Sequence, residues 1–399
     1  MLQISMRIDD PFYVKELIQE ISDRVVGLHC RVVNGNICSY DGDIQLFELP
    51  THISLLDEAN MYVYKNFSVP NDIALGSIAY KNDIITLNIN HSCADGCFLT
   101  QLVSSLGKSG EHFHEKIPKT IYNVFGEQIS KCTFLMKRST HDPDILRFHP
   151  REAPHIVQND NSGKMCFEID FKNMSSYCPQ KNGLVSNTEH VWAALILSAS
   201  AYNEKITSGG ISTIYNMRKH LSLHSFDWNL CNFVASITSY PDIIDPHETL
   251  NVITQRMRLS LETSIDQGRM FSQANLLRSI MEGKNLSQES PLLGEAVEMS
   301  SIGIFRGNQP ISDIRFSLES KAKGVKNIIT VLTYSVQTHE KQYFACQFCY
   351  DPSKISKSDA QLIVEYMQRA LKVVTLDMEF GAALEALNDK SGTLNEYQP

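Results

Sequence analysis

Several features that would assign the sequence to a specialised class of protein are missing. Glycine and proline are sparse, at 20 and 14 of the 399 residues, which excludes collagen-like and low-complexity chains. The longest apolar stretch, residues 191–202, is interrupted by serines and is far shorter than the ~20 residues of a membrane-spanning helix. The first residues show no basic stretch followed by an apolar run, so we expect no secretory signal. These absences favour a cytoplasmic protein without an integral membrane segment.

Excess positive charge and ordered cysteine spacing are missing as well. The chain has 36 Lys and Arg against 45 Asp and Glu, a formal net charge of -9. It therefore offers no basic field for phosphates, and nucleic acid is not an expected partner. The ten cysteines follow no regular spacing and are expected to be free thiols. Cys93 and Cys97 flank the motif at His91 without forming a zinc-ligand spacing, so we expect no metal.

The sequence does contain the elements of a large α/β protein. Hydrophobic residues are 43% of the chain and charged residues 20%, which is a globular composition. Residues 136–164 lose periodicity and gather Pro, Asp, Asn and His, as exposed linkers do. We therefore expect an N-terminal domain at 1–140, a linker at 141–164 and a C-terminal domain at 165–399. From the patterns of apolar residues and the turn and capping signals we expect strands at 2–8, 165–171, 211–221, 232–240, 327–336 and 342–351, a hairpin turning at 81–83, and helices at 10–26, 97–107, 187–203, 245–267, 270–283 and 356–373.

One short segment, NINHSCADGCF at residues 88–98, combines residues suited to chemistry. His91 ends an apolar strand just before a helix, and imidazole is the side chain whose ordinary pKa suits a base near neutral pH. Asp95 can cap the following helix or pair with a distant arginine, while Gly96 removes bulk where another segment or a ligand passes. The alternative is a structural histidine beside an ordinary Asp-Gly turn.

The segment HSCADG matches the H-x-x-x-D-G signature of the chloramphenicol-acetyltransferase-like acyltransferases, and the chain resembles this family over nearly its whole length. The family includes alcohol acetyltransferases, plant acyl-CoA-dependent acyltransferases and the condensation domains of peptide synthetases. Five further segments resemble its strands and helices in order, namely 6–32, 83–106, 187–201, 215–236 and 343–371.

The resemblance implies two chloramphenicol-acetyltransferase-like α/β domains, each a mixed sheet with flanking helices, which enclose a tunnel. Acyl-CoA, the co-substrate, and a small alcohol or amine acceptor would meet in it. His91 would be the general base, and Asp95 would form a structural ion pair, for which Arg218 is the candidate. The oxyanion of the transition state also needs hydrogen-bond donors. The family supplies them from its second half, where Ser236, Thr238 and Ser301 are candidates.

Departures from the family's motifs narrow the expected function. Condensation domains commonly carry two adjacent histidines, where this chain has Asn90 and His91. The plant enzymes carry D-F-G-W-G, and the nearest stretch here, residues 300–305, shares only Gly303. We therefore expect transfer of an acyl group, in the first place acetyl, from CoA to an alcohol. Two alternatives stay open: a non-catalytic binding or interaction protein with the same fold, and a condensation-type transfer from a carrier-bound thioester.

Overall fold

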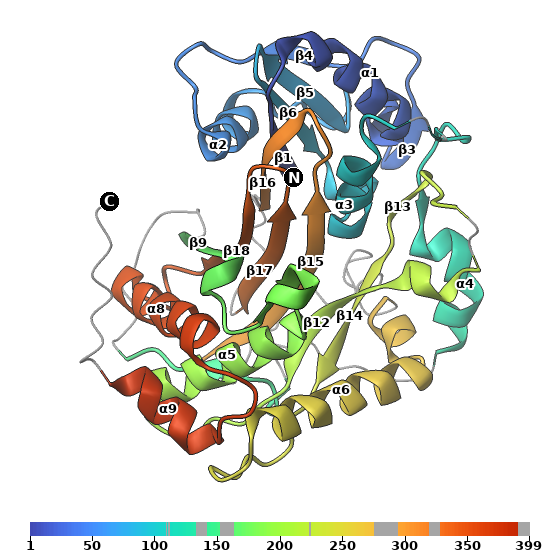
Figure 1. The fold of residues 1–399 in the computed structure, drawn as a ribbon. Coiled ribbons are helices and arrows are strands. Elements are labelled where there is room, and N and C mark those ends of the chain that lie inside the picture. Colours follow the sequence, from blue (N-terminus) through green and yellow to red (C-terminus); the bar gives the residue numbers. More distant parts are fainter. Residues whose placement is uncertain are drawn as a thin grey trace.

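The computed structural model places two β-sheets side by side (Figure 1). It describes residues 1–108, 110, 112–132, 142–151, 163–222, 225–274, 294–318 and 328–389. In that part of the chain no helix is long and apolar enough to cross a membrane. Both sheets have helices against them, which confirms the expected mixed α/β architecture.

The first sheet has five strands and is built mainly from the N-terminal third of the chain. Its order is β16 (Ile311–Leu318), β1 (Leu2–Ile8), β6 (Ile84–Ile89), β5 (Gly76–Lys81) and β4 (Leu46–Glu48). The apolar residues of β1 pack with α1 (Val14–Arg24) and α3 (Gly96–Ser105), whereas its polar residues face the side covered by α2 (Leu56–Asn66). There Gln3 donates a hydrogen bond to Asn88, and the Ser5 hydroxyl is hydrogen-bonded to Asn60 and Thr86, so most of the polar groups of these residues have partners.

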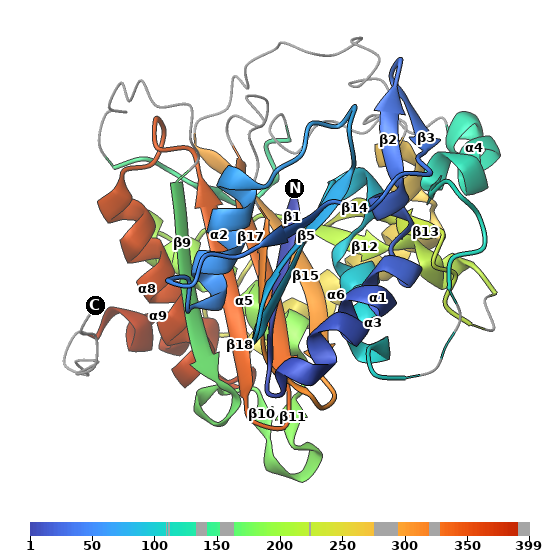
Figure 2. The ribbon, with the colours of Figure 1, turned by 90° about the horizontal axis from the view of Figure 1, so that it is seen from above.

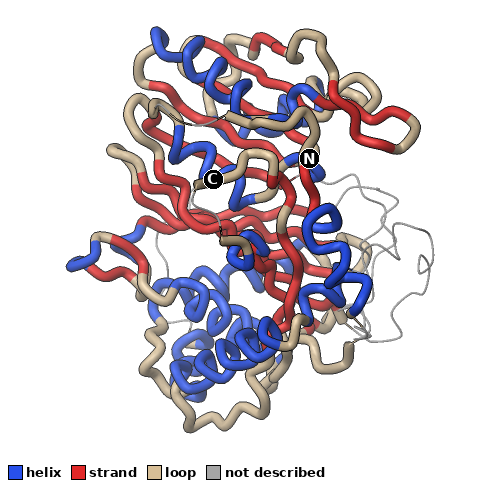
Figure 3. Tube along the Cα trace, turned by 90° about the vertical axis from the view of Figure 1, so that its right-hand side faces the viewer, coloured by secondary structure: helices blue, strands red, loops and turns tan. Residues whose placement is uncertain are grey.

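The second sheet has seven strands and includes both parallel and antiparallel pairs. Its order is β14 (Val234–Ser239), β12 (Ile211–Asn216), β15 (Glu295–Arg306), β17 (Ile328–Gln337), β18 (Gln342–Tyr350) and β9 (Gly163–Asp170), with β8 (Arg147–Phe148) paired to β15. One face packs against α5 (Asn187–Asn203), α6 (Leu250–Asp266), α8 (Lys357–Val373) and α9 (Phe380–Asn388). Figure 3 shows these helices gathered on one side of the strands.

The remaining elements are short and lie around the two sheets. Figure 2 shows the hairpin of β2 and β3 and the helix α4 on the side of the molecule away from α8 and α9. The bounds of these short elements are Cys30–Val33 for β2, Asn36–Ser39 for β3, Ile121–Lys131 for α4, Lys119–Thr120 for β7, Tyr177–Cys178 for β10, Gly183–Leu184 for β11 and Leu230–Asn232 for β13.

Two strand pairings do not respect the predicted division of the chain at the linker 141–164. β16 comes from the C-terminal part and pairs along the whole of β1, from Leu2 opposite Leu318 to Ile8 opposite Ile311. β8 lies inside the predicted linker, yet both of its residues are buried and paired with β15. The domain boundary stays a prediction, and the first sheet contains a strand from each side of it.

Most predicted elements agree with the structure, and the differences have local causes. The predicted helix at 187–203 is α5, and Ser186 precedes it with φ +47 and without a capping side-chain hydrogen bond. The predicted strand at 211–221 ends at Asn216, whose side chain accepts a hydrogen bond from the Arg218 amide and starts a 3₁₀ turn, Met217–His220. Only the beginning of the predicted helix at 270–283 lies within the described residues.

Candidate active site

A cavity of about 490 Å³ lies where strands β12 and β15 part. These parallel strands pair only at Ser212 with Glu298 and at Thr213 with Met299. Beyond that point the sheet has a gap, and the lining residues come from both of its faces. They are supplied by the strands β12, β15 and β17 themselves, by α6 on one face, and by residues 91–97 and the ends of β1 and β16 on the other. The volume is within the usual range for small-molecule sites.

His91 lines this cavity from the turn between β6 and α3. The side chain of Asn90 accepts hydrogen bonds from the Ser92 amide and hydroxyl, both at 2.9 Å, and so caps the short 3₁₀ turn His91–Cys93. Asn90 also donates to Asn71. The residue in place of a second histidine therefore holds the backbone on which His91 sits.

The His91 ring is half-buried, and its Nδ1 lies 3.3 Å from the side-chain nitrogen of Asn232 on β13. Burial lowers the pKa of His91 below its usual value, opposed by hydrogen bonds to backbone carbonyls and by the charge of Asp95. The lowered pKa keeps the ring neutral at pH 7. A neutral imidazole facing a cavity is able to accept a proton.

Asp95 is the N-cap of α3 and is almost fully buried. Its Oδ1 accepts from the Phe98 amide at 2.8 Å, and its Oδ2 accepts from the Phe233 amide at 2.7 Å and from Arg218 Nη1 at 2.9 Å. Arg218 in turn donates to the carbonyl oxygens of Leu230 and Cys231. With its side chain only 1% exposed, the Asp95 carboxylate is committed to these contacts and ties α3 to the second sheet.

Gly96 is the first residue of α3 and meets β15 where that strand carries a bulge. The pairing of β15 with β17 jumps from Ser301 to Gly303, so Ile302 is an extra residue in the strand. A Cβ atom on Gly96 would lie 2.2 Å from Ile302 Cδ1 and 2.8 Å from Ile302 Cγ2. Gly303 has φ +102, which favours glycine. Close packing of the helix start against this bulge therefore requires glycine at position 96.

We expect Gly96→Ala to destabilise the protein by about 1–3 kcal/mol, because the added methyl overpacks this contact. The measurement is the free energy of urea unfolding for the single variant, for Ile302→Val and for the double variant. Shortening Ile302 removes the atom that the new methyl would strike first, so the double variant should regain part of the loss. Additive losses would contradict this contact as the cause.

Of the three hydroxyls proposed as oxyanion donors, only Ser301 lines the cavity. Ser236 is buried and is hydrogen-bonded to Ser212. Thr238 is also buried on β14 and does not line the cavity. Ser300 lines the cavity beside Ser301, because the bulge brings consecutive residues of β15 to the same opening. The role of Ser301 stays a prediction, and Ser300 is a neighbour that the sequence did not single out.

The thiols next to His91 are poorly suited to act as nucleophiles. Burial raises the pKa of Cys93 to about 12 and that of Cys97 to about 11, so both are protonated at neutral pH. Cys97 lines the cavity whereas Cys93 is fully buried. All ten cysteines are free, as the spacing predicted.

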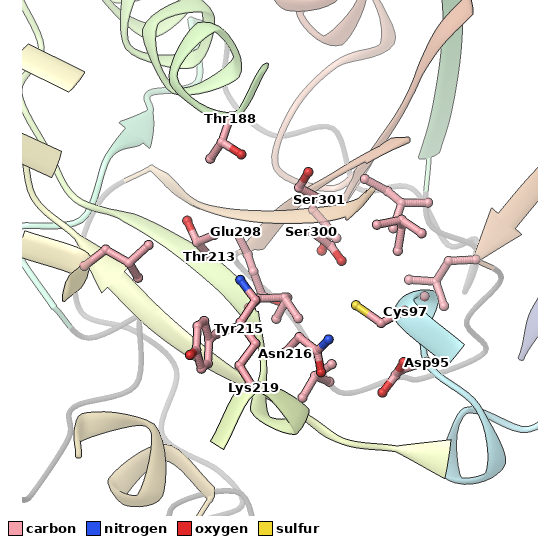
Figure 4. A pocket seen from close by; sticks show the side chains of 18 of the residues that line it. Asp95, Cys97, Thr188, Thr213, Tyr215, Asn216, Lys219, Glu298, Ser300 and Ser301 are labelled. Atoms are coloured by element: carbon pink, nitrogen blue, oxygen red, sulfur yellow. The ribbon is translucent and has the colours of Figure 1, made fainter. Parts of the chain in front are cut away.

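Two residues that sequence reasoning missed contribute to the same cavity region. Asn232 contacts the His91 ring, and Glu298 lines the cavity from β15. Figure 4 shows Glu298 near Thr213 and Ser300, with Asp95 and Cys97 at the start of α3 across the space. Alternation along a strand could have assigned Glu298 to a face, but no local pattern indicates that the sheet opens beside it.

Comparison by sequence finds no relatives: no protein-family model matches the chain, and no curated protein matches it. Comparison by structure finds similar solved structures. The starter condensation domain of rhizomide synthetase, solved with C8-CoA and Leu-SNAC, matches with a TM-score of 0.61 and 9% identity over 95% of this chain and 90% of that chain. The first condensation domain of the calcium-dependent antibiotic synthetase, solved with a substrate analogue, gives 0.60 and 11% over 95% and 93%.

A third similar structure is the epimerization domain from the third module of tyrocidine synthetase B. It gives a TM-score of 0.55 and 11% identity over 97% of this chain and 91% of that chain. At such low identity these likenesses show the fold alone. The fold is the two-lobed chloramphenicol-acetyltransferase-like fold, as the sequence resemblance predicted.

Proposed function

We propose that the protein is an acyltransferase that moves an acyl group from a thioester to an amine or a hydroxyl, with His91 as general base. The observation that carries this proposal is that the His91 ring, whose pKa burial lowers, lines a cavity of about 490 Å³ with walls from both sheets and from α6. A thioester and an acceptor would meet beside this imidazole.

In the proposed reaction the neutral His91 ring takes a proton from the acceptor as its nitrogen or oxygen attacks the thioester carbonyl. The new bond gives a tetrahedral intermediate whose negative oxygen needs a hydrogen-bond donor, and Ser301 is our candidate. Collapse of the intermediate breaks the carbon–sulfur bond. The departing thiolate takes the proton back from His91, so no acyl group is attached to the enzyme.

The acyl donor and the acceptor are proposed on separate grounds. A thioester of a pantetheine arm, either acyl-CoA or a carrier-bound chain, is supported by the similar domain whose structure contains C8-CoA. For the acceptor, the similar domains are named for condensation, which favours an amine over the alcohol that the motif departures led us to expect. Acetyl transfer to an alcohol remains our second candidate.

Incubating the protein with acetyl-CoA, octanoyl-CoA, octanoyl-N-acetylcysteamine and an octanoyl-loaded pantetheinylated carrier protein, each with a panel of amines and alcohols, tests the proposal. We expect thiol release and an acylated product, measured by a thiol reagent and by mass spectrometry. Product with CoA thioesters alone would indicate a CoA-dependent enzyme, and product only with a pantetheinylated carrier would indicate the condensation-type reaction. If no donor gives product and calorimetry shows no thioester binding, the protein is not an acyltransferase.

A further inference from the structure

Glu298 is a carboxylate on the cavity wall that the proposed reaction does not use. It lies on β15 at one of the two positions where β12 and β15 pair, and it lines the cavity together with Ser300 and Thr330 (Figure 4 labels the first two). Thr330 is its direct neighbour on β17. Hydroxyl-bearing side chains on adjacent strands thus accompany the carboxylate on this wall.

Within the described part of the chain Glu298 has no counter-charge. Neither an ion pair nor a hydrogen bond joins its carboxylate to another described residue. Burial raises its pKa, and no charged neighbour contributes to that shift. Glu298 is partly exposed on the cavity wall, so a ligand in the cavity can reach its carboxylate. Such a group indicates a place where a ligand supplies the missing partner.

The other acidic groups of the cavity are accounted for. Asp95 is paired with Arg218, and Glu262 is exposed on α6, where bulk water solvates it. Among the lining cations, Lys219 is exposed and lies over the Tyr215 ring. Arg258 is paired with Glu189 and lies over the Trp192 ring. Among the acidic residues that line the cavity in the described part of the chain, Glu298 is therefore the one that is neither paired nor fully exposed.

We propose that Glu298 binds a cationic nitrogen of the acceptor, so that the acceptor carries two functional groups. One is the amine or hydroxyl that attacks the thioester beside His91, and the other is an ammonium group held at Glu298. The flanking hydroxyls of Ser300 and Thr330 can accept further hydrogen bonds from that ammonium. Diamines and amino alcohols are the simplest members of this substrate class. This inference rests on the proposed acyltransferase function.

The test compares matched acceptors on the wild type and on Glu298→Gln. The probes are a homologous series of α,ω-diamines and α,ω-amino alcohols, each beside the monoamine or alcohol of the same length. Hydrogen bonds to charged groups contribute about 1.5–3 kcal/mol. We therefore expect the variant to lose about 10- to 100-fold in kcat/KM for the dicationic or cationic acceptor and less than about twofold for its neutral partner.

Glu365→Gln is the matched control, because it removes the same charge from the exposed surface of α8 and should leave the ratio unchanged. Equal effects of Glu298→Gln on charged and neutral acceptors would overturn the inference while leaving acyl transfer intact. Calorimetric binding of the diamines gives a readout independent of turnover. Weaker binding in the variant supports the inference even if no transfer is found, whereas unchanged binding refutes it. Lack of turnover with every acceptor in the wild type contradicts only the proposed function.

Discussion

His91→Ala removes acyl transfer and leaves the fold intact. Loss of a general base typically lowers the rate by about 100- to 10,000-fold, and we expect kcat to fall by that range. The side chain is half-buried at the cavity, where it contacts Asn232 at 3.3 Å and is hydrogen-bonded to backbone carbonyls of its own turn. Stability should therefore change by less than about 1 kcal/mol. The measurements are thiol release under saturating substrates and the circular dichroism spectrum of each variant.

His112→Ala is the control for this experiment, because His112 is exposed in a loop outside the cavity. The pH profile of the wild type provides a second readout. Since burial lowers the pKa of His91, kcat/KM should be constant at neutral pH and fall only as the pH drops below about 6.5, where the ring becomes protonated. A folded His91→Ala variant with full activity would exclude His91 as the base.

Asp95→Ala lowers the free energy of unfolding by about 3–5 kcal/mol, the usual loss when one partner of a buried ion pair is removed. The substitution leaves the Arg218 guanidinium buried without its counter-charge. It also removes the cap of α3 and the acceptor of the Phe233 amide. Urea unfolding followed by tryptophan fluorescence measures the loss.

Asp95→Asn separates charge from hydrogen bonding. The amide oxygen can still accept from the Phe98 amide, so this variant should lose less than Asp95→Ala. Combining it with Arg218→Gln removes both charges, and the double variant should be more stable than the sum of the single losses predicts, by about 0.5–3 kcal/mol. Additive losses would show that the pair contributes little and that capping accounts for the effect.

The elements of the fold were predictable because their causes are local. The alternation of residues 2–8 and the turn at 81–83 are enough to predict β1 and the hairpin of β5 and β6. The apolar character of residues 191–202 predicted a helix, and burial of α5 on nearly all sides explains why that character shows little periodicity. Pairing between distant strands, such as β1 with β16, leaves no local trace in the sequence.

The site was predictable only where a motif exists. His91, Asp95 and Gly96 were identified by their spacing, and Arg218 by the resemblance. The choice among Ser236, Thr238 and Ser301 depended on the bulge in β15 and on the gap beside β12, which arise from packing between sheets. Asn232 and Glu298 reach the cavity region through the same tertiary arrangement, so the sequence alone did not single them out.

The strand β16 also restricts relative motion of the two sheets. β16 belongs to the first sheet, whereas the strands before and after it, β15 and β17, belong to the second. Separating the two sheets would therefore break the backbone hydrogen bonds between β16 and β1. Losing that many backbone hydrogen bonds at once is unfavourable. We therefore expect a ligand to reach the cavity without separation of the two sheets, so that slender, extended molecules enter more readily than broad ones.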